Sequence, residues 1–401
     1  MPVDDVVIVG AARTPIGKYG GGLRAVHPAE LGAVAAKAAL ERAGIDAASV
    51  DDVWFGHARQ AGSGPNPARQ VAHRAGLPHS PPAQTINKAC ASGLQAIASG
   101  AQAIASGEAD VVLAGGIESM SRMPYLVDAK DARWGHRLGN VEFVDAMYRD
   151  GFCCPLSDLI MGETAEILAH QYGISRDESD RYALESQARA EAAIAEGRFD
   201  AEIAPVEVAG RKGRVTTVAR DEHPRAGTTL ESLQRLKPVF GEVEGHAGII
   251  TAGSASGITD GGAALVLASA SRATQLGCQP LATITGWASA GVDPRIMGIG
   301  PVPAMQKLLA RLQRSVEDFD LVELNEAFAV QVLAVLRDVP IARDRLNVNG
   351  GAIALGHPIG CTGARIVVTL LHELARRDAA RGLATLCVSG GMGMAMALER
   401  A

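Results

Sequence analysis

The sequence predicts an α/β protein made of two similar halves, with an insertion carried on the first half. Short apolar runs typical of buried strands alternate with helical runs, which is the pattern of α/β proteins. Three short motifs recur in the same order at nearly constant spacing, which indicates an internal duplication. A chain of 401 residues is long enough for two or three units, each with a core of its own.

The apolar and helical runs define the expected elements. Four apolar runs are expected as buried strands, at residues 4–12, 110–116, 263–269 and 383–391. Two longer runs are expected as helices, at residues 28–44 and 365–377.

Three pairs of motifs indicate the duplication. They are "SVDD" at 49–52 with "SVED" at 315–318, Cys90-x-Ser92-Gly93 with Cys361-Thr362-Gly363, and "LAGG" at 113–116 with "VSGG" at 388–391. The offset grows slowly along the chain, which is what a duplication followed by small insertions leaves behind.

Residues 120–250 differ in character from both halves and are interpreted as an insertion. Within them Ser175 and Glu178 form a capping box that starts a helix, and the helical pattern stops at Gly197. A basic segment follows at residues 209–227. The expected organisation is a first half of residues 1–119 and 251–270, an inserted loop domain of residues 120–250, and a second half of residues 271–401.

The composition argues against several classes of protein. With 47% hydrophobic and 20% charged residues the chain is expected to be globular, and a net charge of -6 without a basic arm argues against a nucleic-acid partner. No apolar stretch reaches the roughly 18 residues of a membrane helix, and the first residues show no secretory signal. We therefore expect no membrane association and a cytoplasmic location. The six cysteines contain no CxxC pair, and no metal-ligand spacing such as HExxH is present.

The stretch "NKACASGLQAIASG" at residues 87–100 places a lone thiol, Cys90, between an expected strand and an expected helix. The N-terminus of a helix offers free N–H groups and the positive end of its dipole, both of which favour a thiolate. Small neighbours leave the sulfur accessible. Cys90 is therefore a candidate nucleophile, and an inert buried cysteine is the alternative that the local sequence leaves open.

Three further segments hold candidate residues, each with a structural alternative. His357 lies in a glycine-rich stretch and is either a base for a thiol or a histidine that bonds its own loop. Cys387 precedes a glycine-rich turn and is either a second thiol of the same site or a small core residue. Asn325 and Glu326 end the apolar run "FDLVEL", which is a common place for functional residues in an α/β sheet and also for a helix N-cap.

Taken together and in this order, the motifs resemble those of the thiolase family. They are Cys-x-Ser-Gly at Cys90, "NEAFA" at 325–329, "GGAIALGHPIG" at 350–360 and Cys-x-x-Gly-Gly-Met-Gly at Cys387. The resemblance covers the full chain and includes "ARTPIGKYGG" at 12–21, "GGIESMS" at 115–121, "MGETAE" at 161–166 and "TAGSASGITDGGAA" at 251–264. Any one motif could be accidental, whereas the ordered set is highly specific.

The resemblance implies a layered α-β-α-β-α fold of two fused α/β halves, with an inserted loop domain that covers coenzyme A. It implies reversible acyl transfer through Cys90, either thiolysis of 3-ketoacyl-CoA or condensation of acetyl-CoA to acetoacetyl-CoA. His357 would take the proton of Cys90, and Cys387 would move the proton on the α-carbon. Asn325 would hold a water that, with His357, donates to one thioester oxygen. Backbone N–H groups of Cys90 and Ser389 would bind the second oxygen.

The same resemblance implies that coenzyme A and acyl-CoA are the substrates, with no bound cofactor and no metal. Arg225 would contact the nucleotide end of coenzyme A, and Ala252 and Ser256 would contact the pantetheine arm. Met161 and Phe328 would line the acyl pocket. A role in fatty acid metabolism and a homodimer or homotetramer are also implied.

Two positions depart from the family's pattern. Ser389 stands where a glycine is usual and lacks glycine's access to positive φ. Ile160-Met161-Gly162 stands where short-chain biosynthetic members often carry His-Met-Gly, which leaves specificity for acetoacetyl-CoA open.

Three alternatives stand beside a thiolase for acetoacetyl-CoA. The first is a thiolase for longer or dicarboxylic 3-oxoacyl-CoA, such as 3-oxoadipyl-CoA. The second is a condensing enzyme that uses acyl carrier protein; Cys387 argues against it, because those enzymes pair their cysteine with two histidines or with His and Asn. The third is a non-catalytic lipid-binding member, which tends to lose the nucleophile or its base, whereas all four catalytic positions are present here.

Overall fold

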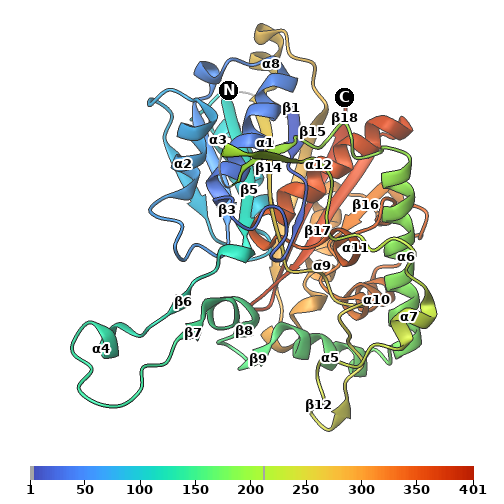
Figure 1. Cartoon of the computed structure of the whole chain (residues 1–401). Coiled ribbons are helices and arrows are strands. Elements are labelled where there is room, and N and C mark those ends of the chain that lie inside the picture. Colours follow the sequence, from blue (N-terminus) through green and yellow to red (C-terminus); the bar gives the residue numbers. More distant parts are fainter. Residues whose placement is uncertain (1–3, 211–212) are drawn as a thin grey trace.

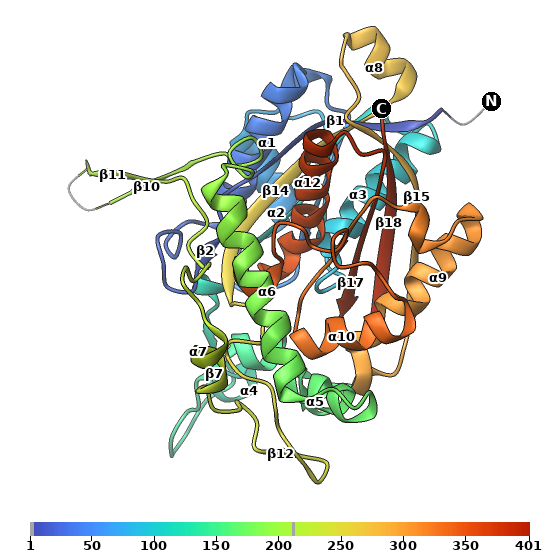
Figure 2. The ribbon, with the colours of Figure 1, turned by 90° about the vertical axis from the view of Figure 1, so that its right-hand side faces the viewer.

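The computed structural model describes residues 4–210 and 213–401. Residues 1–3, at the start of the expected first half, and residues 211–212, in the basic segment, lie outside the described residues. Among the described residues, ten strands form one large sheet (Figures 1 and 2). The strands are β1 (Val6–Arg13), β2 (Gly17–Lys18), β3 (Asp52–His57), β4 (Ala83–Ile86), β5 (Val111–Ser119), β14 (Thr259–Ser269), β15 (Ala282–Gly291), β16 (Leu321–Leu324), β17 (Arg381–Val388) and β18 (Met392–Arg400). Their order is β4-β3-β5-β14-β1-β15-β18-β17-β16, with β2 beside β14.

The main helices cover both outer faces of this sheet and fill the space between its two halves. They are α1 (Pro28–Ala43), α2 (Pro67–Ala75), α3 (Ser92–Ala105), α8 (Ala270–Leu276), α9 (Pro301–Leu312), α10 (Ala329–Asp338), α11 (Ala352–Leu355) and α12 (Ile359–Arg377). None of the described helices combines the length and the apolar character that crossing a membrane requires.

Three hydrophobic clusters show the layers. The first lies between α1, α2 and the strands β1, β3, β5 and β14. The second surrounds α3 and α12 and includes strands from both halves of the sheet. The third lies between α9, α10 and the strands β15 to β18. The order is therefore helix, sheet, helix, sheet, helix, and the predicted layered α/β fold is confirmed.

The two halves of the sheet have the same topology. In the first half, β3 is parallel to β4 and β5, β5 is antiparallel to β14, and β14 is antiparallel to β1. In the second half, β16 is parallel to β17, β17 is antiparallel to β18, and β18 is antiparallel to β15. A parallel bridge between Val322 and Leu346 stands in the place of β4. The repeated motifs thus lie on a repeated fold, while the domain boundaries at residues 119, 250 and 270 stay a prediction.

A short seam joins the two halves into one sheet. β1 pairs with β15 over two residue pairs, Val7 with Thr283 and Ile8 with Ala282. On its other side β1 pairs with β14 along its whole length. The first strand of the chain therefore lies in the middle of the finished sheet.

The central helices α3 and α12 cross in close contact at two glycines. A Cβ at Gly363 would lie 2.4 Å from the backbone nitrogen of Leu94, and a Cβ at Gly93 would lie 2.7 Å from that of Ala364. Because glycine disfavours helices, the sequence pattern places the start of α12 too late: the helix begins at Ile359, inside the glycine-rich stretch. Close packing against a neighbouring helix here outweighs the low helix propensity.

The residues between β5 and β14 form two longer helices and several short hairpins. The elements are β6 (Tyr125–Leu126), α4 (Ala129–Ala132), β7 (Val144–Asp145), β8 (Cys153–Cys154), β9 (Leu159–Ile160), α5 (Met161–Gln171), α6 (Arg176–Ala195), β10 (Val206–Ala209), β11 (Val215–Val218), α7 (Leu230–Gln234), β12 (Glu242–Val243) and β13 (His246–Ala247). The predicted capping box is confirmed, because Ser175 and Glu178 cap α6 reciprocally and Gly197 follows its end with a φ of 67°.

The segment from β6 to β7 projects away from the rest of the molecule (Figure 1, lower left). We call residues 125–145 the arm. Three large apolar side chains of the arm are exposed: Trp134 at 80%, Leu138 at 92% and Phe143 at 68%. Exposed apolar residues gathered in one segment are typical of an interaction surface.

Candidate active site

A cavity of about 260 Å³ brings together most of the predicted site residues. Of those residues, its wall contains Cys90, Met161, Ser256, Phe328, His357, Cys387 and Ser389. Cys90 belongs to the first half of the chain, whereas His357 and Cys387 belong to the second. The cavity therefore forms where the two halves of the fold meet.

Cys90 lies in a strained turn between β4 and α3. Ala89 has a φ of 45°, in the left-handed region that a residue with a Cβ seldom adopts. The Ser92 hydroxyl holds this turn, because it accepts the Lys88 N–H at 2.9 Å and donates to the Ala89 carbonyl at 2.6 Å. The turn places Cys90 one residue before the N-cap of α3, Ala91, close to the helix N-terminus as the sequence predicts.

The surroundings keep the Cys90 thiol and the His357 imidazole uncharged. Burial raises the pKa of Cys90, although the Ser389 backbone N–H and the positive charge of Arg59 oppose this shift. Burial also lowers the pKa of His357 to about 3, and the positive charges of Arg365 and Arg59 lower it further. Low polarity disfavours charge on both groups, so the resting pair is a neutral thiol and a neutral imidazole.

Thr362 fixes the tautomer of His357. The Thr362 hydroxyl lies 2.6 Å from Nδ1 of His357 and donates its own proton to the Pro358 carbonyl at 3.0 Å. When the hydroxyl proton points to the Pro358 carbonyl, Nδ1 is the donor in its contact with Thr362, and Nε2 carries the lone pair. Among the described residues no hydrogen bond joins His357 to Cys90, so Nε2 is unengaged and is the nitrogen that can accept a proton.

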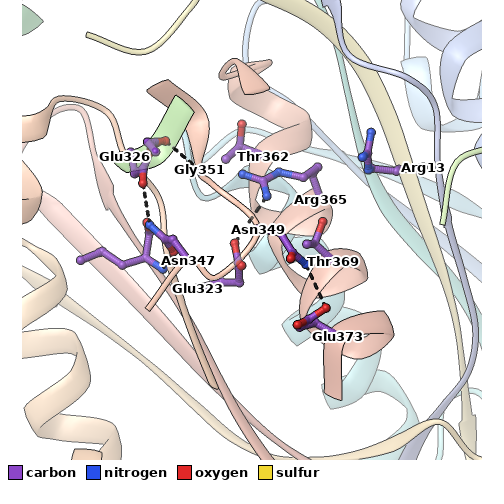
Figure 3. A network of polar contacts seen from close by, with 12 residues as sticks. Arg13, Glu323, Glu326, Asn347, Asn349, Gly351, Thr362, Arg365, Thr369 and Glu373 are labelled. Carbon is purple, nitrogen blue, oxygen red and sulfur yellow. Dashed lines mark hydrogen bonds and ion pairs between the residues drawn. The ribbon is translucent and has the colours of Figure 1, made fainter. Parts of the chain in front are cut away.

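Buried polar contacts anchor the segment that leads to His357. Figure 3 shows Asn347 donating to Glu326 at 3.0 Å and Asn349 donating to Glu373 at 3.0 Å. Each bond ties the segment to a different element, the end of β16 and the last turns of α12. The segment is therefore anchored to two different elements of the second half.

Glycine is required next to His357. Gly356 has a φ of 102°, and a Cβ there would lie 2.3 Å from Cγ2 of Thr259. On its other side, the backbone N–H of His357 donates to the Gly257 carbonyl at 3.0 Å. The imidazole is thus placed by backbone geometry as well as by Thr362.

Cys387 is fully buried near the end of β17, in a small cluster with Met297 and Ala327. Burial raises the pKa of this thiol well above its ordinary value, and the neighbouring Cys90 raises it further. The two sulfurs are therefore close enough to interact electrostatically, and both line the cavity. The position agrees with a second thiol of one site.

Ser389 does not need the conformational freedom of the glycine it replaces. Among the described residues, the left-handed positions of this turn are Gly390, with a φ of 85°, and Gly391, with a φ of 81°. Ser389 itself is not in the left-handed region. A serine at this position therefore leaves the backbone turn intact, and its N–H acts to lower the pKa of Cys90.

Asn325 follows β16 and is buried, at 1% exposure, but it is not part of the cavity wall. Neither its Oδ1 nor its Nδ2 has a hydrogen-bond partner among the described residues. It is not a helix N-cap, because the cap position of α10 is Phe328. Its neighbour Glu326 is structural and accepts hydrogen bonds from Tyr182, Ser186, Asn347 and the Ile353 N–H.

The residues expected along coenzyme A divide between two cavities. Ser256 lines the cavity of Cys90, whereas Arg225 and Ala252 line a second one of about 180 Å³. The backbone N–H of Arg225 donates to Gln187 of α6 at 3.0 Å, which fixes its backbone beside this second cavity. Ala252 and Ser256 lie in one continuous segment before β14. This segment therefore contributes to the walls of both cavities.

A buried polar group beside the cavity was not foreseen from the sequence. Glu118 accepts the backbone N–H of Arg59 at 3.2 Å and that of Gly360 at 2.9 Å. His57 lies 3.1 Å from the same carboxylate through its Nε2. The Arg59 side chain lines the cavity and donates to the Gly151 carbonyl at 2.7 Å. Their place in the sequence could have indicated a role at the site, because Arg59 follows β3 and Glu118 lies near the end of β5, and polar residues at strand ends are often functional in α/β sheets.

The described residues contain no group of three or more His, Cys, Asp or Glu side chains that could hold a metal ion.

Comparison with known proteins places the whole chain in one family. The family model described as "Thiolase, N-terminal domain" matches residues 6–271, and "Thiolase, C-terminal domain" matches residues 278–400. Among curated proteins, the acetyl-CoA acetyltransferase of Cupriavidus necator is 52% identical over 396 residues, which cover 99% of each chain. That of Escherichia coli is 51% identical over 394 residues, which cover 98% of each chain.

Solved structures agree with this placement. The acetyl-CoA acetyltransferase of Bacillus anthracis superposes with a TM-score of 0.96 at 46% identity, over 100% of this chain and 99% of that one. Human mitochondrial 3-ketoacyl-CoA thiolase in complex with CoA superposes with a TM-score of 0.94 at 44% identity, over 100% of this chain and 98% of that one.

Proposed function

The chain belongs to the thiolase family of acyltransferases, and we propose that it moves acyl groups between coenzyme A thioesters through a thioester on Cys90. The observation that supports this most directly is the shared cavity wall of Cys90, His357 and Cys387. In the degradative direction, a 3-ketoacyl-CoA and free coenzyme A give a shortened acyl-CoA and acetyl-CoA. In the reverse direction, two acetyl-CoA give acetoacetyl-CoA and free coenzyme A.

In the first step the Cys90 sulfur attacks the keto carbon while Nε2 of His357 takes the thiol proton. Because burial disfavours both thiolate and imidazolium, a free ion pair is costly before substrate binds. We therefore propose that proton transfer accompanies the attack, so that negative charge develops on the substrate oxygen.

In the proposed mechanism two different substrate oxygens each have their own hydrogen-bond donors. The backbone N–H groups of Cys90 and Ser389 would bind the oxygen of the carbonyl that Cys90 attacks, and the Ser389 N–H already opposes the rise of the Cys90 pKa. Asn325 would hold a water that, with His357, donates to the other thioester oxygen, a role that suits a buried amide with no protein partner among the described residues. One such donor typically lowers the barrier by about 3 kcal/mol.

Carbon–carbon cleavage then releases the enolate of acetyl-CoA, which takes a proton from Cys387. In the condensation direction Cys387 removes that proton instead. A thiol that is neutral at rest can supply the proton directly, and burial keeps Cys387 in that form. Free coenzyme A finally takes the acyl group from Cys90.

Coenzyme A is the proposed substrate in the two neighbouring cavities. Human 3-ketoacyl-CoA thiolase, a relative of the same fold, has been solved with CoA. Arg225 and Ala252 would meet its nucleotide end and upper arm, and Ser256 its lower arm beside Cys90. Met161 and Phe328 would line the acyl pocket.

We also propose that the protein works as a homodimer or homotetramer in fatty acid metabolism. The exposed apolar residues of the arm support self-association. All six cysteines are free, which suits a reducing compartment and supports a cytoplasmic location. Fractionation of cells followed by immunodetection tests the location directly.

A single labelling experiment tests the proposed function. After brief exposure to acetyl-CoA, mass spectrometry of the digested protein is expected to show one acetyl group, on Cys90. Cys90→Ala is expected to lose both the label and acetoacetyl-CoA thiolysis, whereas Cys153→Ala, which removes an exposed thiol, retains both. Acetylation at another residue with Cys90 unmodified would refute the assignment.

A further inference from the structure

Arg59 is the one permanently charged side chain among the described residues that line the cavity of Cys90. The rest of that wall consists of apolar side chains, glycines, the two thiols, His357, two serines and a tyrosine. A guanidinium remains charged at any physiological pH. The cavity therefore presents a fixed positive charge within an otherwise apolar surface.

The charge of Arg59 has little compensation from the protein. The residue is 7% exposed. Its Nη2 donates to the neutral carbonyl of Gly151, while its Nε is buried without a partner. Among the described residues no carboxylate lies within ion-pair distance of the guanidinium. Glu118 binds the backbone of Arg59, and its paired side chain is His57.

A buried cation in apolar surroundings is costly unless an anion and hydrogen-bond acceptors meet it. The cost falls when the occupant of the cavity supplies a carboxylate, which matches the planar donors of a guanidinium. Arg59 lines the same cavity as Cys90, Met161 and Phe328, so an acyl chain that lies along Met161 and Phe328 shares this cavity with the guanidinium. The thioester end of that chain is at Cys90.

We infer that Arg59 selects 3-oxoacyl-CoA substrates whose acyl chain ends in a carboxylate. This inference rests on the proposed thiolase function and adds the substrate class. Thiolysis of such a compound breaks the bond between the α- and β-carbons. It gives acetyl-CoA and the coenzyme A thioester of a dicarboxylic acid, with the terminal carboxylate unchanged and no oxidant or reductant required.

A different role for Arg59 predicts a different result. If its purpose is only to hold Gly151 and the hairpin that follows, removal of the charge disturbs the cavity for every acyl chain alike. The ratio of activities on two substrates of equal length, one with and one without a terminal carboxylate, separates these roles.

The test compares thiolysis of 3-oxoadipyl-CoA and 3-oxohexanoyl-CoA, which have the same chain length and differ at the terminal group. Wild-type enzyme is expected to favour the dicarboxylic substrate in kcat/KM by at least about tenfold, since a buried charged donor penalises a substrate that leaves it unpaired. Arg59→Met is expected to remove or reverse that preference, and Arg59→Lys to retain part of it. Arg272→Met, which removes a half-buried arginine of α8 that is not part of the wall, leaves the ratio unchanged.

Each outcome decides the inference. A wild-type preference for 3-oxohexanoyl-CoA, or a ratio that Arg59→Met leaves unchanged, overturns it. Acetoacetyl-CoA thiolysis by the wild-type enzyme is measured in the same series and reports on the proposed function alone. If that activity is present and the ratio shows no dependence on Arg59, the thiolase assignment stands and the substrate class is wrong.

Discussion

At the scale of single residues, the site contains two thiols in different surroundings. Cys90 is half-buried at the start of α3 and has the Ser389 N–H as a neighbour. Cys387 is fully buried in an apolar cluster. A half-buried sulfur can be reached by an acyl group, whereas an enclosed one is better suited to exchange a proton with a carbon held beside it.

Replacement of Cys387 by Ala is therefore expected to separate the two chemical steps. The variant retains acetylation on Cys90, because thioester exchange at that sulfur needs His357 and the oxyanion donors. It loses about 10²- to 10⁴-fold in acetoacetyl-CoA thiolysis and in condensation, the usual contribution of a general acid–base group. Radiolabelled acetyl-CoA measures the first step and acetoacetyl-CoA absorbance the second.

Cys278→Ala is the matched control, since Cys278 is also buried but lies in the outer cluster of α1 and α2. Thiolysis by Cys387→Ala within a few-fold of wild type would make Cys387 a packing residue and contradict the proposed proton transfer.

The neutral resting state of Cys90 and His357 predicts a pH dependence. Burial favours the uncharged form of each group, raising the pKa of Cys90 and lowering that of His357 to about 3. The thiolate fraction is then small near neutrality and grows with pH. The rate of Cys90 alkylation by iodoacetamide is expected to rise steadily from about pH 6 to about pH 9 without a plateau.

A thiolate–imidazolium pair would behave in the opposite way, with a fast rate already at neutral pH and a plateau above it. Alkylation is followed by mass spectrometry on the peptide of Cys90, and the exposed Cys153 serves as an internal reference in the same digest.

At the scale of helices and strands, two opposite effects act where α3 and α12 cross. Glycine lowers helix propensity, but its missing side chain allows the two helices to pack closely. Helix propensity alone predicts that Gly363→Ala stabilises α12 by about 1 kcal/mol. The added Cβ would instead lie 2.4 Å from the Leu94 nitrogen, a backbone atom that cannot move aside easily. Overpacking typically costs about 1–3 kcal/mol, so we expect a net loss of stability.

Urea denaturation measures this change, with Gly241→Ala as the control because a Cβ at Gly241 meets nothing within 4 Å. The loss should also reduce activity, since α3 begins beside Cys90 and α12 beside His357. A Gly363→Ala variant as stable as wild type would show that the two helices can separate without cost.

The strands β1, β5, β14 and β17 were predicted correctly from their apolar runs. Each run is short and lies next to glycines, and this length is typical of a buried strand and too short for a helix. The start of α12 could not be predicted, since its glycines serve a contact with a helix far away in the sequence. Motifs predicted that Cys90, His357 and Cys387 share one site. Arg59 belongs to none of these motifs, and Glu118 lies within "GGIESMS" without an assigned role, so their proximity becomes visible only when β3 and β5 lie side by side.

At the scale of the whole molecule, the arm is the feature that the fold of one chain does not explain. Its residues Trp134, Leu138 and Phe143 are more exposed than large apolar side chains normally are. If the arm is a contact between copies, the double variant Trp134→Ser with Leu138→Ser is expected to weaken association by at least about tenfold, since a buried side chain of this size contributes about 1.5–3 kcal/mol.

Sedimentation velocity over a range of protein concentrations measures that change. Val215→Ser, an exposed apolar position on a different hairpin, is the control. Unchanged sedimentation of the double variant would remove the arm from the proposed interface.

The central place of β1 has a consequence for how the protein is made. A ribosome releases β1 first, yet its partners β14 and β15 begin at residues 259 and 282. At about 5–20 residues per second, the wait for β14 lasts about 12–50 seconds. During that time the apolar segment "VVIVGAAR" has no strand of its final sheet beside it. The nascent chain thus exposes an unpaired apolar strand until β14 has been made. We expect chaperones that bind apolar segments at the ribosome exit to bind it.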